Sequence, residues 1–416
     1  MTADGTAREA GSPAGDGWSP WRVVVGFGVV SLAADMVYEG ARSVYGPLLA
    51  SLGASALVVG AVTGAGEAVA LVLRLVSGPW ADRTRRYWTL TIAGYATTAV
   101  CVPLLAVAPM LGGAGLVVAG SLILMERAGK AVRSPAKSAL LADAAGQVGM
   151  GRGLGVHKAL DQVGAFAGPL LVAGLISVSG GDLRLALAVL AVPGAVAMAL
   201  LLLTRRQSPG PPPDPPPVAD AGTTTGVAVE RAPLPPAFWR FAVAASLCTA
   251  GLVGFGLIGF NAADQDLLPL AAVPVLYAGA MAAGAVAALA TGEAYDRVGA
   301  RVLLVLPLLV AAVPPLALGG SLGLVVPGAL LWGAAVGVQD STVKAMVADL
   351  VPRGRRATAY GLFAAVQGAG ALVAGVTAGA LYQRHLGALV AVTAVGQAVA
   401  FVLLVRTIAT ARGRPA

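Results

Sequence analysis

The chain has 416 residues, of which 57% are hydrophobic and only 12% are charged, and its mean hydropathy is +0.81. This composition excludes a soluble globular protein, because so little charge cannot cover a surface of that size, and it predicts that lipid surrounds much of the chain. The net charge of +8 would suit a nucleic-acid partner, but the arginines gather in short turns between apolar runs, so we expect no nucleic acid.

Twelve apolar runs follow a polar first stretch, and each is long enough to predict a membrane-spanning helix. The predicted spans are 22–47, 56–77, 88–108, 114–136, 154–177, 183–204, 238–260, 272–291, 302–320, 322–343, 358–382 and 388–407. Residues 1–21 lack the apolar core of a signal peptide and are predicted to form an N-terminal tail. The predicted fold is an all-α integral membrane protein.

A polar, proline-rich stretch separates the sixth run from the seventh. Residues 205–237 are predicted to link an N-terminal six-helix bundle, 22–204, to a C-terminal six-helix bundle, 238–407, and residues 408–416 form a short tail. Arginines concentrate in the turns on the side of both chain ends, whereas the opposite turns carry about one each. We therefore expect cytoplasmic termini, a cytoplasmic linker and a location in the plasma membrane.

A short charged turn occurs once in each half, each time between two apolar runs. The first copy is 78–86 (GPWADRTRR) and the second is 292–301 (GEAYDRVGAR). Repetition at matching places in a chain of membrane spans is typical of transporters built from two homologous halves. The repeat predicts two pseudo-symmetric bundles around a central cavity.

These features resemble the major facilitator superfamily over essentially the whole chain. The first copy is similar to that superfamily's turn Gly-x-x-x-Asp-Arg-x-Gly-Arg-Lys, with Arg85 where the second glycine is usual, and the second copy keeps this glycine. The resemblance implies that the Asp of the turn latches the two halves in one conformation. The residues assigned to the latch are Gly78, Asp82, Arg83, Arg86, Asp296, Arg297 and Gly299.

The first half holds several charged side chains within its apolar runs. Each costs about 2.5–3.5 kcal/mol at membrane depth, so such residues normally face a partner or a watery cavity. A buried carboxyl with no cation one turn away, such as Asp35, can take up and release a proton near neutrality. The candidate proton-coupling residues are Asp35, Glu39, Glu67, Arg127, His157 and Asp161.

Two of these candidates have structural alternatives. Glu39 and Arg42 are three residues apart and would equally suit a rim ion pair. His157 and Asp161 share a helix face, so they would either relay protons or form a hydrogen bond that only fixes helix packing. The sequence does not decide between these alternatives.

The predicted substrate-binding residues come from both halves. On the fourth span, Arg127 matches an arginine that the resemblance links to proton transfer, and Lys130 stands where the superfamily usually has Gln. Glu126 and Lys130 would either neutralise each other or contact substrate, and Asp340 and Lys344 are spaced for a structural ion pair. The candidate substrate-binding residues are Glu126, Lys130, Gln339 and Gln367.

The fifth span carries two glycines four residues apart, followed by proline. Gly164 and Gly168 allow close helix contact, and Pro169 favours a bend. The run also resembles the Gly-x-x-x-Gly-Pro motif of the superfamily's exporters, where it is linked to antiport. This likeness favours export over uptake.

No pattern in the chain predicts an enzyme. Two histidines and two cysteines give no usual zinc spacing, and no Gly-x-x-x-x-Gly-Lys-Ser/Thr run is present, so we expect neither metal nor cofactor. We predict a monomeric secondary transporter that exports a small organic molecule or drug in exchange for protons. The alternatives are proton-coupled uptake of an organic anion and a non-transporting membrane sensor on the same scaffold.

Overall fold

The computed structural model describes residues 17–208, 234–351 and 356–412, and these ranges contain helices and turns but no strand. Ten helical stretches within them are long and apolar enough to cross a membrane. Two of the ten, Tyr87–Val148 with 62 residues and Ala272–Ala317 with 46, exceed the roughly 20 residues that one crossing needs. The arrangement is consistent with the twelve predicted spans. Most of the predicted linker and parts of both tails lie outside the described residues.

The helices of each half follow one another in chain order. The first half contains α1 (Pro20–Arg42), α2 (Tyr45–Ser51), α3 (Ala56–Val72), α4 (Arg74–Thr84), α5 (Tyr87–Leu104), η1 (Leu105–Ala114), α6 (Gly115–Val148), α7 (Met150–Val178), α8 (Leu183–Val189) and α9 (Ala191–Gln207). The second half contains α10 (Pro236–Gly251), α11 (Phe255–Asp264), α12 (Ala272–Val298), η2 (Gly299–Leu304), α13 (Val305–Ala317), α14 (Leu322–Leu350), α15 (Arg356–Tyr382) and α16 (Leu386–Arg412).

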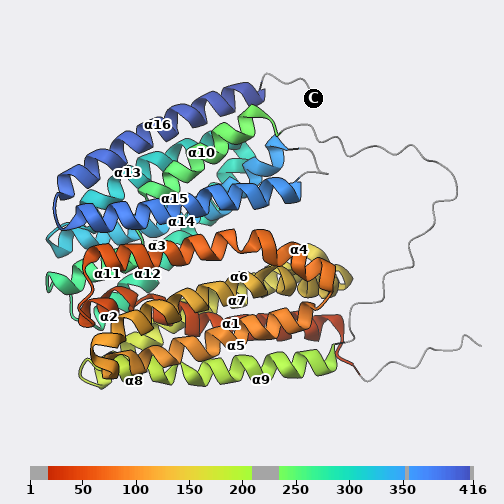
Figure 1. The fold of residues 1–416 in the computed structure, drawn as a ribbon. Coiled ribbons are helices and arrows are strands. Elements are labelled where there is room, and N and C mark those ends of the chain that lie inside the picture. The colour runs from red at the N-terminus through yellow and green to blue at the C-terminus, as the bar shows by residue number, and fades with distance from the viewer. Residues whose placement is uncertain (1–16, 209–233, 352–355, 413–416) are drawn as a thin grey trace, which may run out of the picture.

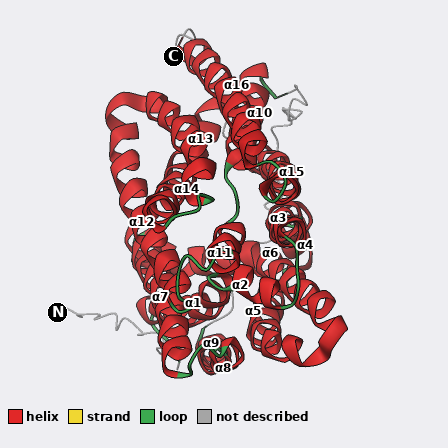
Figure 2. Cartoon of the chain, turned by 90° about the vertical axis from the view of Figure 1, so that its left-hand side faces the viewer, coloured by secondary structure: helices red, strands yellow, loops and turns green. Residues whose placement is uncertain are grey.

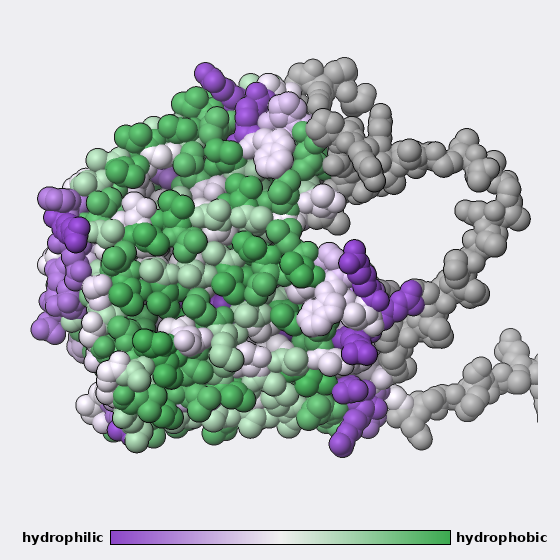
Figure 3. Space-filling model, viewed as in Figure 1, coloured by the Kyte–Doolittle hydropathy of each residue, from purple (hydrophilic) through white to green (hydrophobic). Residues whose placement is uncertain are grey.

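The two halves form two bundles that lie against each other, with α3 of the first half beside α15 of the second (Figures 1 and 2). We call the end of the molecule that carries α4 the Asp82 end and the end that carries α2 and α11 the Asp264 end. Figure 3 shows an apolar belt around the middle of one face, with hydrophilic residues gathered at both ends. Because lipid offers no hydrogen bonds, helices with internally satisfied backbones are the structure that such a belt requires.

Closely packed glycines set the distances between helices. A Cβ atom on Gly164 or Gly168 of α7 would lie 2.2 Å from the Leu32 carbonyl oxygen or 2.3 Å from the Met36 carbonyl oxygen of α1. The close helix contact predicted for Gly164 and Gly168 is therefore the contact of α7 with α1. Pro169 lies inside α7, which continues as one helix.

The halves also meet without intervening side chains at the Asp264 end. There α2 packs on α11, and a Cβ on Gly46 would lie 2.1 Å from the carbonyl oxygen of Gly256 and 2.5 Å from the backbone nitrogen of Phe260. Such an approach leaves no room for a larger residue. This contact closes the seam between the halves at the Asp264 end.

The two copies of the repeated turn differ in backbone geometry. Arg85 ends α4 in the left-handed region, with φ 51° and ψ 18°, which costs an ordinary residue some free energy but remains accessible. Gly299 ends α12 with φ 67° and ψ −155°, a region that only glycine populates readily. This difference explains why the first copy tolerates arginine where the second has glycine.

Candidate functional site

A cavity of about 230 Å³ lies between the halves, and both halves line it. A second space of about 900 Å³ shares Leu71, Gln339, Asp340 and Gln367 with it and extends to Gly78 and Asp82. The two spaces therefore form one route from the middle of the bundle towards the Asp82 end. The cavity walls differ sharply between the halves.

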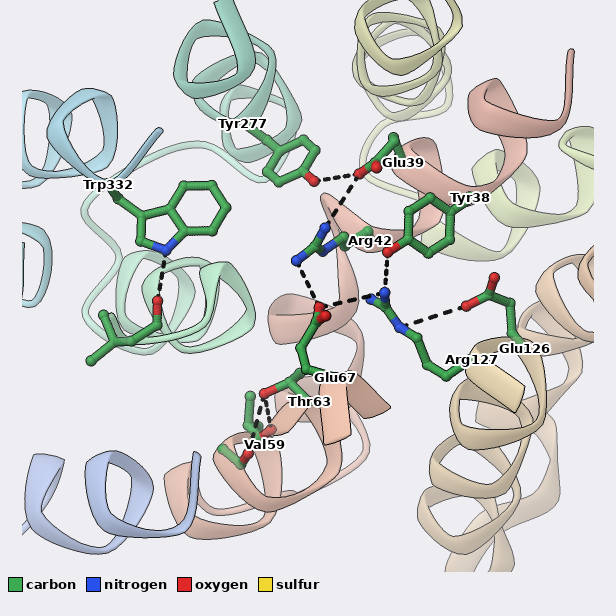
Figure 4. Close-up of polar contacts among 12 residues, drawn as sticks. Tyr38, Glu39, Arg42, Val59, Thr63, Glu67, Glu126, Arg127, Tyr277 and Trp332 are labelled. Carbon is green, nitrogen blue, oxygen red and sulfur yellow. Dashed lines mark hydrogen bonds and ion pairs between the residues drawn. The ribbon is translucent and has the colours of Figure 1, made fainter. Parts of the chain in front are cut away.

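Charged groups form the wall of the first half (Figure 4). Glu67 of α3 accepts a hydrogen bond of 2.8 Å from Arg42 of α1, and the same oxygen lies 3.4 Å from a guanidinium nitrogen of Arg127 of α6. The Glu67 side chain keeps 37% of its surface exposed, whereas that of Arg127 keeps 5%. Glu67 is thus a carboxylate of the first half that the cavity reaches, and its two arginine partners line the cavity beside it.

Arg127 is fixed by further partners on its buried side. Its guanidinium donates to the hydroxyl of Tyr38 and lies 3.6 Å from the fully buried carboxylate of Glu126. The ammonium of Lys130 lies 3.4 Å from the centre of the Tyr38 ring, a cation–π contact. Glu126 pairs with Arg127, and Lys130 stacks on Tyr38; neither lines the central cavity.

One contact of this network crosses between the halves. The Tyr277 hydroxyl of α12 donates to Glu39 of α1, and the same carboxylate lies 3.8 Å from Arg42. Figure 4 shows the chain of contacts running from Tyr277 through Glu39 and Arg42 to Glu67. Glu67 is therefore connected to the opposite half through two ion pairs, with Arg42 between Glu67 and Glu39, and one hydrogen bond from Tyr277 to Glu39.

The wall of the second half is uncharged apart from Asp340. The side-chain amides of Gln339 and Gln367 both donate to the Thr249 hydroxyl, at 2.7 and 3.3 Å. Trp332 donates its indole N–H to the Val253 carbonyl at 2.7 Å, and its ring lies 5.5 Å from that of Phe255. This wall offers amide oxygens and aromatic faces, which suit a ring-containing molecule with a polar edge.

A second charged cluster lies between α1 and α7. The carboxyl groups of Asp35 and Asp161 are neighbours that interact electrostatically, and Asp161 accepts a hydrogen bond of 2.8 Å from Lys158. His157 contacts the hydroxyl of Ser31 at 3.2 Å, so its hydrogen bond goes to α1 and not to Asp161. The close packing of α1 on α7 creates this carboxyl pair, which joins residues 126 positions apart.

Two of the predicted latch residues lie in the wall of the wider space. Gly78 and Asp82 line it, and Asp82 accepts 3.2 Å from Tyr87 of its own half. In the second copy, Arg297 donates to Glu293 within the same helix. The side chain of Lys344 lies outside the described residues, so its predicted pair with Asp340 has no structural counterpart here.

Sequence reasoning missed the aromatic hydroxyls that hold the network together. Tyr38 and Tyr277 are buried in apolar helices. A phenol in the middle of a membrane span is a usable signal, because its O–H needs a partner there. Among the described residues, no group of three or more histidine, cysteine or acidic side chains could hold a metal ion.

Comparison with known proteins gives both a family and a fold. The family model of the Major Facilitator Superfamily matches residues 27–283 and 268–416. An uncharacterized protein of Mycobacterium tuberculosis is 50% identical over 386 residues, 93% of each chain. An uncharacterized MFS-type transporter of Methanocaldococcus jannaschii is 29% identical over 144 residues, 35% of each chain.

Solved structures share the fold at low identity. The chain resembles a nucleoside transporter at 15% identity and TM-score 0.70, covering 93% of this chain and 99% of the other. A peptide transporter in complex with alafosfalin is 17% identical, with TM-score 0.70 and 94% of each chain covered. A bacterial homologue of the iron transporter ferroportin in an inward-facing state is 14% identical, with TM-score 0.68 and coverages of 93% and 98%.

Proposed function

The chain belongs to the major facilitator superfamily and is a membrane transporter, and on that premise we propose that it exports a small organic molecule in exchange for protons. The observation that carries the proposal is the neighbouring carboxyl pair Asp35–Asp161, which lies between α1 and α7 beside the ion-pair network of the cavity. Two neighbouring carboxylates repel each other when both are ionised, which favours a proton on one of them. The pair is therefore a site at which one proton can be held and released.

Alternating access supplies the transport cycle. The cavity is closed at the Asp264 end by the α2–α11 contact and extends to the Asp82 end, so a substrate enters from the latter. With the Asp82 end in the cytoplasm, this is the inward-open state, and rocking of the halves would carry the substrate outwards. The Glu39–Tyr277 hydrogen bond and the Gly46 contact must both part for the Asp264 end to open.

Protonation is coupled to this movement through Lys130 and Lys158. Lys158 balances the ionised carboxyl of the pair, while Lys130 acts electrostatically on both Asp35 and Glu67. A proton that binds to the Asp35–Asp161 pair reduces the negative charge near Lys130 on the Asp35 side and leaves the charge of Glu67 unchanged. We expect this change to alter the electrostatic attraction between Lys130 and Glu67. The altered attraction would shift the balance between the open and closed arrangements of the two halves.

The cavity chemistry supports an uncharged or zwitterionic substrate with a ring more than an anion. Arg42 and Arg127 are both already paired with Glu67, so an anion would have to displace that carboxylate. The opposite wall supplies two amides and the Trp332 face. Uptake of an organic anion therefore has no specific observation in its favour.

The test is transport of a library of aromatic and heteroaromatic compounds into inside-out vesicles with an acid interior. We expect gradient-dependent accumulation by the native chain. Asp35→Asn should abolish the gradient dependence while leaving substrate-for-substrate exchange, because the amide keeps the size of the side chain but carries no titrating proton. Asp143→Asn, at an exposed carboxylate of α6, is the matched control and should behave as the native chain.

Two outcomes would contradict the proposal. Accumulation only in right-side-out vesicles would reverse the direction of transport. Loss of substrate-for-substrate exchange in Asp35→Asn would assign this residue to substrate binding or to folding, and not to proton coupling.

A further inference from the structure

A groove lies on the outside of the first half, away from the central cavity. It has a volume of about 710 Å³ and runs between α1 and α9 at the Asp82 end. Its walls are Trp18, Trp21, Arg22, Val25, Gly26, Val29, Leu200 and Thr204. The transport mechanism uses none of these residues.

The groove is built by one aromatic side chain folded against a glycine. A Cβ on Gly26 would lie 2.8 Å from the Trp18 ring and 3.0 Å from the Thr204 hydroxyl, so only glycine lets the indole lie this close to α1. The backbone N–H of Trp18 donates 2.8 Å to the carbonyl of Gln207, which ties the segment before α1 to the end of α9. Trp18 therefore forms a fixed wall of the groove.

The mouth of the groove is basic. Arg22 is exposed on its rim, and Arg205 and Arg206, also exposed, directly follow the wall residue Thr204. None of the three forms an ion pair or hydrogen bond with another residue in the part of the chain that the structure describes. An apolar channel flanked by tryptophans and capped by free cations has the chemistry of a membrane interface that faces anionic headgroups.

We propose that this groove binds an anionic phospholipid, with an acyl chain along Val25 and Val29 and the phosphate at Arg22. The bilayer supplies the occupant, because the groove opens on the lipid-facing surface of a multi-pass protein. Charge complementarity selects an anionic lipid, since Arg22 lines the groove, Arg205 and Arg206 follow its wall residue Thr204 at the end of α9, and no carboxylate lines the groove. The bound lipid would hold α1 against α9, on the side of α1 away from the substrate cavity.

The second half provides a built-in comparison. Trp239 and Arg240 open α10 as Trp21 and Arg22 open α1, but Arg240 already donates 2.9 Å to the Thr410 hydroxyl. The second half therefore has the same residue types at the equivalent place, but its arginine, Arg240, already has a hydrogen-bond partner within the protein. This makes Arg240 and Trp239 matched controls.

The experiment measures lipid retention by the purified full chain in detergent, using native mass spectrometry with phosphatidylglycerol and phosphatidylcholine in equal amounts. We expect one retained phosphatidylglycerol per chain. Arg22→Gln should weaken retention by about fivefold, the change that about 1 kcal/mol per basic side chain produces. Arg22→Lys should keep most of the retention, and Arg240→Gln should leave it unchanged.

Location is tested by fluorescence with brominated acyl chains. Brominated phosphatidylglycerol should quench the native protein more than brominated phosphatidylcholine does. The double variant Trp18→Phe/Trp21→Phe should remove most of that difference, because both indoles line the groove, whereas Trp239→Phe should not. Equal retention of the two lipids, or an unchanged Arg22→Gln variant, would overturn the proposal. Displacement of the lipid by millimolar inorganic phosphate would instead make the site one for a free anion and would also overturn it.

Discussion

The two halves repeat one architecture but contribute different chemistry to the cavity between them. The wall from the first half is a charged network centred on Glu67, whereas the wall from the second consists mainly of uncharged side chains such as Gln339, Gln367 and Trp332, with Asp340 beside them. The repeated turn survives in both halves, so the backbone plan was kept while the side chains diverged. The difference teaches that proton chemistry and substrate fit need not be shared equally between repeats.

An unequal division has a mechanistic consequence. On the proposed mechanism, a proton bound in the first half changes the charge on that side of the cavity, whereas the amides of Gln339 and Gln367 do not titrate. Substrate recognition through the second half can therefore vary without disturbing the titrating groups. The following predictions test that separation, in order of decreasing effect.

Removing the shared carboxylate should have the largest effect. Glu67→Gln leaves Arg42 and Arg127 without their common partner, and hydrogen bonds to charged groups contribute about 1.5–3 kcal/mol each. We expect transport to fall by roughly ten- to a hundredfold. Asp143→Asn, at an exposed carboxylate of α6 outside the network, should leave transport unchanged. Near-native transport by Glu67→Gln would remove the network from the mechanism.

Crowding the closed end should shift the conformational balance next most strongly. Gly46→Ala places a methyl group against the α11 backbone, and overpacking of this kind costs about 1–3 kcal/mol. The Asp264 end should open more often. The measurement is the labelling rate of Thr63→Cys, in the cavity wall, by an impermeant maleimide applied from that end. Gly113→Ala, where a Cβ meets no atom within 4 Å, is the control, and equal rates in both would contradict the expectation.

Shortening an amide on the wall of the second half should weaken binding without affecting proton coupling. Gln339→Ala removes a hydrogen-bonding group worth about 0.5–1.5 kcal/mol, so substrate affinity should fall roughly two- to tenfold. The pH dependence of transport should stay that of the native chain. A shifted pH profile would show that the two walls are not separate in function.

Exchanging the turn residues should have the smallest effect. Gly299→Ala should cost about 1 kcal/mol of unfolding free energy or slightly more, because the methyl group meets open space and only the backbone angles are unfavourable. Arg85→Gly should change stability by less than about 1 kcal/mol, since relief of the left-handed angle offsets the greater freedom of glycine in the unfolded chain. Thermal unfolding of the two variants in detergent measures this contrast, which equal shifts would refute.

The fold was largely predictable because lipid restricts the choices. Apolar length alone predicts spanning helices, and the family match and helical model agree with that prediction. Breaks inside spans were not predicted: α1 ends at Arg42 and α2 begins at Tyr45, within one continuous apolar run. A hydropathy profile does not detect such a break, because a turn buried against another helix can be as apolar as the helices on either side of it.

The candidate site was predictable in its residue types but not in its pairings. Charges in apolar runs identified Asp35, Glu67 and Arg127, because each must find a partner or water at that depth. Which partner it finds depends on how helices pack, as in the Tyr277–Glu39 hydrogen bond across 238 positions. No local spacing rule reaches that far along a chain.

The glycine contact between α3 and α15 has a consequence for how the sequence can vary. A Cβ on Gly60 or Gly375 would lie within 2.2 Å of the opposing backbone, so these helices touch main chain to main chain across the seam of the two halves. With no side chains interdigitated there, the helices can tilt against each other without any rotamer having to change. This contact should therefore allow α3 and α15 to tilt against each other, while allowing few substitutions of the glycines that form it. In a deep mutational scan, glycines on these two faces should tolerate fewer substitutions than the charged residues of the cavity.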